Sequence, residues 1–307
     1  MLRERLVARG MTGERADHSA RLFAEASRDG IASHGLNRFP RFLRMIDNGS
    51  IDVHAEPSLA QAFGALERWD GRRGPGNLNA WASMARAIAL ARDHGIGCVA
   101  LANTNHWMRG GAYGWQAADA GVAAICWTNT LANLPPWGAS EPRIGNNPIV
   151  IAVPRPGGHI VLDMAASQFS VGVLTAYAAR GERLPVAGGY DAEGTLTDDA
   201  QAILESQRLL PIGFWKGSGL SLMLDLLAAG VSGGCATHEI AKDPERETSL
   251  SQMFIAIANV EPCADAVLAH FHGGAGDARH PGERTLATRA RSVREGVEVD
   301  EAVWRSL

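Results

Sequence analysis

Lysine is nearly absent from the 307-residue chain, because only Lys216 and Lys242 occur among its 29 basic residues. Cysteine is scarce as well, and neither the cysteines nor the histidines have the spacing of a zinc finger; the cysteines are Cys98, Cys126, Cys235 and Cys263. A disulfide-stapled scaffold is therefore excluded, and a reducing compartment is expected. Residues 1–30 lack an apolar signal region, and no apolar run approaches the ~18 residues that cross a membrane. We expect a cytoplasmic protein without a membrane partner.

A strong excess of charge of one sign is also missing. The chain has 29 basic and 33 acidic residues, spread along its length, and a formal net charge of -4. A nucleic-acid partner would require a basic patch or stripe, so no nucleic acid is expected. The composition, 46% apolar and 20% charged, is typical of a globular protein, and the length suggests about two domains.

Helical and strand-like segments alternate along the chain. Thr12 can cap a first helix that ends at Gly30, Pro40 suits the first turn of a second helix, and Asn77 can cap a third that runs through Asp93. Further helices are expected at about 112–120, 167–179, 220–229 and 283–294, and strands at 96–102, 122–128, 149–153, 159–164 and 251–258. This alternation predicts an α/β protein.

A short polar connector between the first two helices carries the first candidate site. His34 follows Ser33 and stands four residues before Arg38. Histidine exchanges a proton near neutral pH, and the arginine fork can hold a carboxylate through two hydrogen bonds. The pair therefore suits a 2-keto or 2-hydroxy acid. The alternative is a histidine that bonds only to its own loop and an arginine on the surface.

Two further groups lie at or after the ends of predicted strands. His106 and Arg109 follow the strand at 96–102, where α/β proteins tend to place ligands, unless this loop packs at a subunit contact. Asp163 stands near the end of the strand at 159–164, where an unpaired carboxylate would be costly to bury. Its partner is either a catalytic histidine or a structural group such as a helix N-terminus.

An apolar helix is preceded by the sequence Trp215-Lys216-Gly217-Ser218-Gly219. Glycine amides, a helix N-terminus and a cation all attract phosphate, and the alternative is a glycine-rich helix start with a surface lysine. The motif lacks the third glycine of a dinucleotide fingerprint, so neither an ordinary Rossmann domain nor a Walker P-loop is expected. His270 and His272 lie on one probable helix without a nearby carboxylate ligand, so no metal site is predicted.

Longer motifs carry more information than these single residues. They run from Ser33 to Phe42, Asp93 to Gly97, Asn105 to Gly111, Trp127 to Asn129, Pro135 to Ala139 and Trp215 to Gly219. In these motifs the chain resembles the type-2 malate/L-lactate dehydrogenase family, and the similarity extends from about Gly10 to Trp304.

The resemblance implies a nicotinamide-dependent reductase with a non-Rossmann α/β fold, in which a mixed-sheet domain is joined to a helical domain. Residues 1–115 and 260–307 would form a mainly helical part for substrate binding and dimerisation, and residues 116–259 the cofactor-binding α/β part. A homodimer and NAD as cofactor are also implied. NADH is expected over NADPH, because no basic cluster follows the cofactor strand.

Matching by position extends the resemblance to single residues. His34 matches the histidine assigned as proton donor in one member of the family, and His106 matches the acid/base histidine assigned in another member. Arg38 matches a residue near the substrate carboxylate, and Asp163 is counted with these catalytic residues. Thr130 falls where relatives place a small hydroxyl residue beside the cofactor. The other implied cofactor-binding residues are His159, Ile160, Val161, Leu162, Asp163, Met164, Ala165, Trp215, Lys216, Gly282, Glu283 and Arg284.

The expected reaction is hydride delivery from NADH to a 2-keto sugar acid, with His34 as imidazolium donating a proton to the developing alkoxide. Rival substrates within the family are malate, lactate, ureidoglycolate, sulfolactate and a cyclic imino acid. Rivals of another class are a metal-dependent hydrolase that uses His34, His106 and Asp163, and a non-catalytic binding module.

Overall fold

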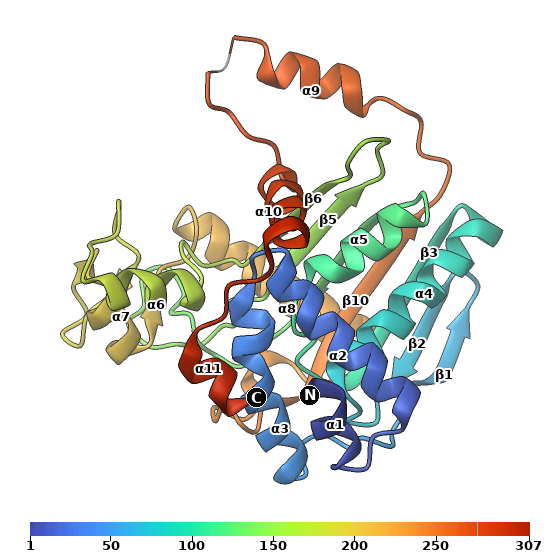
Figure 1. Ribbon diagram of the computed structural model, residues 1–307, viewed down its shortest axis with the longest axis horizontal. Coiled ribbons are helices and arrows are strands. Elements are labelled where there is room, and N and C mark those ends of the chain that lie inside the picture. Colours follow the sequence, from blue (N-terminus) through green and yellow to red (C-terminus); the bar gives the residue numbers. More distant parts are fainter. Residues whose placement is uncertain (275) are drawn as a thin grey trace.

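The computed structural model of the protein describes residues 1–274 and 276–307, which are built around one seven-stranded sheet (Figure 1). Its strands lie in the order β1-β2-β3-β10-β4-β5-β6, and β2 and β3 form the one parallel pair of this sheet. Their bounds are β1 Ser58–Phe63, β2 Leu66–Asp70, β3 Ile96–Asn105, β10 Thr248–Ile257, β4 Ala123–Thr128, β5 Ile149–Val153 and β6 Ile160–Met164. A Rossmann domain has a mostly parallel sheet, so the expected non-Rossmann, mixed-sheet α/β fold is confirmed.

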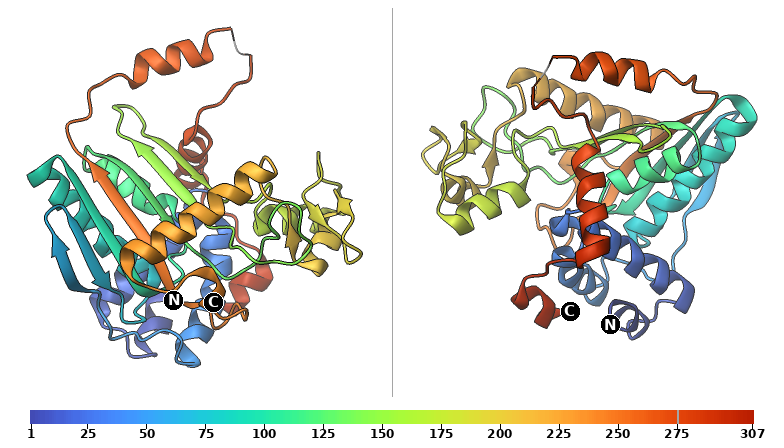
Figure 2. Two further views of the ribbon diagram at one scale, coloured as in Figure 1. Left: turned by 180° about the vertical axis from the view of Figure 1, so that it is seen from behind. Right: turned by 45° about the horizontal axis from the view of Figure 1, so that its top comes forward.

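Helices cover both faces of this sheet. α4 (Gly76–His94) and α5 (Gly111–Asp119) lie on one face, and α8 (Trp215–Ser232) crosses the other (Figure 2, left). Successive strand residues point to opposite faces. In β3, Val99 and Leu101 accordingly pack into the core that includes α4 and α5, whereas Ala100 packs with α8.

The N-terminal helices form a second apolar core around Phe23, Phe39 and Phe42. Its helices are α1 (Leu2–Val7), α2 (Gly13–Arg28), α3 (Phe39–Asp47) and, from the other end of the chain, α11 (Glu301–Ser306). Two short 3-10 turns, η1 (Ala32–His34) and η2 (Leu36–Arg38), connect α2 to α3 and carry the first candidate site. α10 (Glu283–Glu295) contacts α2 and thereby joins the C-terminal part to this layer.

Two smaller parts extend from this body (Figure 1). One is a three-stranded sheet, in the order β8-β7-β9, which has two helices and an apolar cluster of its own. Its elements are α6 (Val171–Arg180), β7 (Gly189–Tyr190), β8 (Leu196–Thr197), α7 (Ala200–Ser206) and β9 (Arg208–Leu209). The other is α9 (Ala264–His272), which follows β10 and stands on an extended arm at the top of Figure 1; η3 (Thr237–Glu239) lies between α8 and β10.

Most expected elements are present, but several boundaries were predicted wrongly. The helix expected to be capped by Asn77 begins at Gly76, and the Asn77 side chain donates to Ser19 instead. The helix expected at 220–229 begins at Trp215, because the Ser218 amide already donates to the carbonyl of Phe214 in the α-helical pattern. The glycines that were expected to form a phosphate loop before the helix therefore lie within it.

The hairpin of β1 and β2 has no counterpart in the sequence analysis. The sequence of β1, Ser-Leu-Ala-Gln-Ala-Phe, lacks the alternation of apolar and polar residues that marks a half-buried strand. All residues of β1 are accordingly exposed. The expected domain division runs through the large sheet, because β3 before residue 115 and β4 after it both pair with β10. Within the described residues, no helix combines the length and apolar character needed to span a membrane.

Candidate active site

His34 and His106 face each other at the centre of the candidate site. η1 ends at His34, and His106 follows directly after β3. Their imidazole rings stack with centroids 5.7 Å apart and planes inclined by 21°. The fold thus brings together the two histidines that the sequence analysis placed on separate loops.

Hydrogen bonds give the two imidazoles different protonation chemistry. His106 Nδ1 accepts the amide of Met108 at 3.0 Å, so the neutral ring carries its proton on Nε2. His34 Nδ1 lies 3.0 Å from the Ser33 hydroxyl, which can act as donor or acceptor. His34 can therefore gain or lose a proton and keep this bond, whereas a proton on Nδ1 of His106 would point at another N–H.

Both histidines are neutral at pH 7 when no substrate charge is nearby. Burial, followed by the charges of Arg38 and Arg109, lowers the pKa of His34 to about 4. Burial, Arg38 and His34 lower the pKa of His106 well below its ordinary value. Because cations lower a histidine pKa and anions raise it, a carboxylate bound beside Arg38 would raise the pKa of His34.

Arg38 lies beside a buried carboxylate, Glu247, that the sequence analysis did not single out. The guanidinium is 3.6 Å from Glu247 Oε2, and the two side chains are 18% and 5% exposed. Burial lowers the pKa of Arg38 to about 10 and raises that of Glu247, while their mutual attraction opposes both shifts. The separation is long for a hydrogen bond, so the Arg38 fork keeps donors for a second acceptor.

Thr130 lies near Arg38 and Glu247, because Glu247 accepts the amide of the next residue, Leu131, at 3.2 Å. Thr130 is 4% exposed, and its hydroxyl lies 3.1 Å from Oδ1 of Asn146 and 3.3 Å from Oδ1 of Asn147. The backbone between β4 and β5 is therefore held in place on one side of Arg38.

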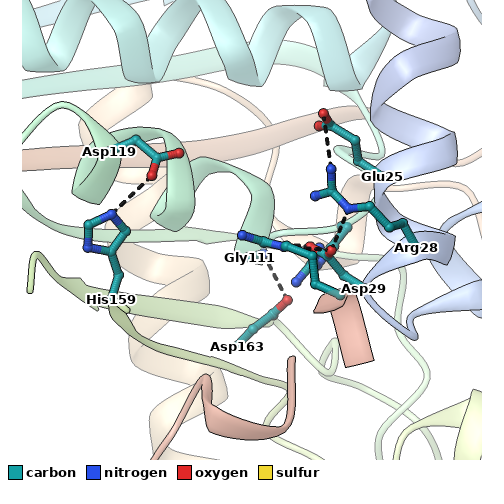
Figure 3. A network of polar contacts seen from close by, with 9 residues as sticks. Glu25, Arg28, Asp29, Gly111, Asp119, His159 and Asp163 are labelled. Atoms are coloured by element: carbon teal, nitrogen blue, oxygen red, sulfur yellow. Dashed lines mark hydrogen bonds and ion pairs between the residues drawn. The ribbon is translucent and has the colours of Figure 1, made fainter. Parts of the chain in front are cut away.

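Asp163 has a structural partner, the second of the two possibilities that the sequence left open. It accepts the amide of Gly111 at 2.8 Å, at the first residue of α5 (Figure 3). Desolvation raises the pKa of the Asp163 carboxyl, and the hydrogen bond from the Gly111 amide and the charge of Arg109 oppose that rise. Among the described residues, no histidine forms a hydrogen bond with Asp163.

Asp29 connects three arginines beside this helix N-terminus. It accepts hydrogen bonds from Arg28, Arg109 and Arg289, and its side chain is 1% exposed. Burial alone would raise the pKa of Asp29, but the bonds from Arg289 and Arg28 and the charge of Arg109 hold it well below its ordinary value. Since Arg289 lies on α10, this network, shown in part in Figure 3, ties α10 to α2 and to Arg109.

A pocket of about 310 Å³ is lined by Arg109, which bonds to Asp29, and by residues of two of the predicted cofactor segments. Its walls come from β6, from the start of α10 with the segment before it, from α5 with the loop before it, and from the loop after α2. The lining residues are Ile31, Arg109, Trp115, Val161, Leu162, Asp163, Arg279, His280, Pro281, Gly282 and Thr285. Gly282 adopts φ +94°, and a Cβ there would lie 3.0 Å from the amide of Val161 and 3.1 Å from the carbonyl of His159. The start of α10 therefore rests directly on β6.

The remaining predicted cofactor residues lie around β6 or are exposed. Just after β6, the carbonyl of Ala166 accepts the amide of Ile212 at 2.8 Å, and this bond holds the start of α8 near the end of β6. Trp215 and Lys216, the first two residues of α8, are exposed. His159 is held by Asp119 at 3.0 Å (Figure 3). Arg284 is exposed, and Glu283 accepts the amide of His280. Because a strand rises about 3.3 Å per residue, His159 and Ala165 are separated by about 20 Å.

Two other features bear on rival interpretations. A larger cavity of about 630 Å³, lined mainly by α2 and α4, contains none of the predicted site residues. Within residues 1–274 and 276–307, the ligand atoms of His34, His106 and Asp163 do not converge as a metal site would require, whereas those of His272, His280 and Glu283 do. The rival metal-dependent hydrolase built on His34, His106 and Asp163 therefore has no geometric support.

Three residues that position the predicted groups could not be recognised from the sequence: Glu247, Asp29 and Arg289. Each is an ordinary charged residue outside the quoted motifs, and no local pattern marks it. The signal that could have found them is the need for partners, because Arg38 and Arg109 are largely buried guanidiniums and buried charges are normally paired.

The chain is similar over its whole length to known dehydrogenases and reductases. The family model described as malate/L-lactate dehydrogenase matches residues 1–307. The 2,3-diketo-L-gulonate reductase of Escherichia coli is 45% identical, over 98% of this chain and 95% of that protein. Among solved structures, Δ1-piperideine-2-carboxylate reductase from Pseudomonas syringae has a TM-score of 0.90 at 33% identity, covering 99% of this chain and 95% of the other. Sulfolactate dehydrogenase from Methanocaldococcus jannaschii has a TM-score of 0.88 at 26% identity, covering 99% and 92%.

Proposed function

The chain belongs to the malate/L-lactate dehydrogenase family and is an NAD(P)-dependent oxidoreductase, and we propose that it reduces 2,3-diketo-L-gulonate to 3-keto-L-gulonate with NADH in the cytoplasm. The observation that carries this proposal is the meeting of Arg38, His34 and His106. Arg109, whose charge acts on His34, lines the pocket formed by β6 and the start of α10. The similarity to the reductase from Escherichia coli supports a sugar acid as the substrate.

The pocket fits part of a nicotinamide cofactor. Its volume is within the range of small-molecule sites, and the Arg109 Nε beside it is buried without a hydrogen-bond acceptor. Residues 159–165 with Thr130, and residues 282–284, would hold the cofactor, with Trp215 and Lys216 at the far end of β6. When bound, the reduced nicotinamide supplies the hydride.

The residues of the chain supply orientation and the proton. Arg38 binds the substrate carboxylate with the donors that Glu247 leaves free, and this fixes the direction of the adjacent carbonyl. The carboxylate offsets the charge of Arg38, so His34 becomes imidazolium when the substrate binds and donates its proton to the developing alkoxide.

His106 polarises the carbonyl as a neutral donor. Its proton is on Nε2 because Nδ1 accepts the Met108 amide, and giving this proton up would leave an imidazolate. His34 is therefore the proton donor, and His106 is not.

We also propose that the chain forms a homodimer through α8. Leu222, Met223, Leu226 and Leu227 are 44–55% exposed on the side of α8 that faces away from the sheet. A contiguous apolar surface of this kind on a helix is typical of an interface between proteins.

The test is steady-state kcat/KM for NADH oxidation with 2,3-diketo-L-gulonate, pyruvate, oxaloacetate, sulfopyruvate and Δ1-piperideine-2-carboxylate, with NADPH in parallel. We expect the diketo acid to have the highest kcat/KM and NADH to exceed NADPH. A higher value for another acid would replace the proposed substrate and leave the family unchanged. Measurable NADH binding without turnover of any acid would favour a non-catalytic binding module.

A further inference from the structure

Three potential metal ligands lie together between the end of α9 and the beginning of α10. His272 is the last residue of α9, Glu283 is the first residue of α10, and His280 stands in the segment that leads into α10. His280 Nδ1 is 3.1 Å from His272 Nε2 and 3.3 Å from Glu283 Oε2. We propose that these three residues bind a divalent transition-metal ion of the Zn²⁺ type, which ties α9 to the first turn of α10.

Hydrogen bonding alone does not satisfy this arrangement. An imidazole Nδ1 holds at most one proton. If Nδ1 of His280 is protonated, it can donate to His272 or to Glu283 but not properly to both. If it is unprotonated, its lone pair faces an acceptor-only carboxylate oxygen. One cation in contact with all three atoms removes this conflict, because each of them then uses a lone pair.

The spacing and the types of ligand point to the class of ion. Ligands about 2.0–2.2 Å from a tetrahedral Zn²⁺ lie about 3.3 Å apart, which agrees with the two separations at His280. The three ligand atoms lie within 4.8 Å of one another, and His272 is exposed, so its ring can turn to close the third side. Two imidazoles and one carboxylate suit Zn²⁺ better than Mg²⁺ or Ca²⁺, which prefer oxygen ligands.

The absence of a metal motif in the sequence has a simple cause. Considered alone, His270 and His272 are two histidines on one helix without a carboxylate. The fold turns His272 toward His280 and Glu283, while His270 is exposed and takes no part in the group. His270 therefore provides a matched control on the same helix.

Zn²⁺ binding by tag-free protein, first dialysed against a chelator, tests the proposal by isothermal titration calorimetry. We expect one saturable site per chain, and a loss of at least tenfold in affinity for His272→Ala and for Glu283→Gln. His270→Ala should bind as the unchanged protein does.

Substitution of Co²⁺ gives an independent spectroscopic measurement. Visible absorption bands of a tetrahedral site should appear with the unchanged protein and with His270→Ala but not with His272→Ala. Because His272 is exposed, His272→Ala should fold normally, and circular dichroism checks this. The proposal is overturned if no saturable binding occurs, or if His270→Ala and His272→Ala weaken binding equally.

Discussion

At the scale of single residues, one backbone amide separates the roles of two stacked histidines. The Met108 amide occupies Nδ1 of His106, and the rotatable Ser33 hydroxyl lies at Nδ1 of His34. Only the hydroxyl can reverse its direction when the imidazole gains a proton. In the proposed mechanism His34 therefore titrates during the reaction, and His106 does not.

The pH dependence of the reduction tests this difference. A proton donor acts only in its protonated form, so kcat/KM should fall about tenfold per pH unit above the pKa of His34, which is about 4 in the free protein. The decline in kcat should begin at a higher pH, because the bound carboxylate raises the pKa of His34. Steady-state kinetics between about pH 5 and 8 measure both profiles.

Substitution of His34 provides the control for these profiles. His34→Ala should lower kcat by about 10²–10⁴-fold and leave the Kd for NADH unchanged. The pH dependence of kcat/KM should disappear in this variant. An unchanged kcat would remove His34 from the mechanism.

Asp29 should contribute strongly to stability, because it is the carboxylate shared by Arg28, Arg109 and Arg289. Asp29→Asn leaves the buried guanidinium of Arg109 and the partly buried ones of Arg28 and Arg289 without their counter-charge. It should lower the free energy of unfolding by roughly 3–5 kcal/mol. Urea denaturation at pH 7 measures this loss. The matched control is Asp47→Asn, which breaks the more exposed ion pair with Arg9 and should cost at most about 1 kcal/mol.

Acid conditions give a second test of Asp29. Its pKa is lowered in the folded protein, so the stabilisation is complete above the unfolded value of about 3.9 and is lost as the pH falls toward the folded value. Asp29→Asn should therefore lose less stability than the unchanged protein between about pH 5 and 2. Equal losses in the two proteins would contradict the role of Asp29.

At the scale of elements, the contact between α10 and β6 forms one side of the pocket. The Val161 amide donates to the carbonyl of Pro281, and Gly282 adopts φ +94° where a side chain would meet the backbone of β6. A glycine is required here both for the positive φ and for the close approach. The proposed cofactor site depends on this contact, because the two segments that line it are far apart in the sequence.

Gly282→Ala should therefore weaken NADH binding. The added Cβ forces the start of α10 away from β6, and we expect Kd for NADH to rise more than tenfold, as measured by NADH fluorescence. Gly138→Ala is the control, because Gly138 has a similar φ of +90° but nothing within 4 Å of the added atom. Equal effects of the two variants would mean that backbone strain, and not the contact with β6, is responsible.

At the scale of the whole molecule, the sheet is covered on both faces but the outer side of α8 is not. α8 packs against β10, β3 and β4 with residues such as Leu224 and Ala228, and its other side exposes Leu222, Met223, Leu226 and Leu227. A second copy of the chain that packs on this surface would remove four large apolar side chains from water.

Leu226→Glu should therefore convert the proposed dimer into monomers. A carboxylate in the centre of an apolar interface is costly to bury, and Leu226 is 55% exposed in the single chain, so the fold itself should tolerate the change. Sedimentation velocity measures the oligomeric state. Leu196→Glu, at an exposed position in the small sheet, should leave the dimer intact, and a monomeric unchanged protein would contradict the proposal.

Much of the fold could be predicted from the sequence because local patterns carry it. Glycines end helices at Gly95 and Gly121, and apolar runs form the strands that follow them. The hairpin of β5 and β6 is also present as expected. The exposed strand β1 and the early start of α8 could not be predicted, because neither shows the periodicity that distinguishes helices from strands.

The candidate site could likewise be predicted only in part from the sequence. The sequence by itself determined the family motifs, the alternation of helices and strands, and which residues carry chemical groups, such as His34, Arg38 and His106. Only the tertiary structure decided which group each of these side chains contacts: Arg38 lies beside Glu247, Arg109 bonds to Asp29, and Gly282 rests on β6. The reason is physical, since pKa values, tautomers and close backbone approaches depend on neighbours that lie far apart in the sequence and meet only when the whole chain folds.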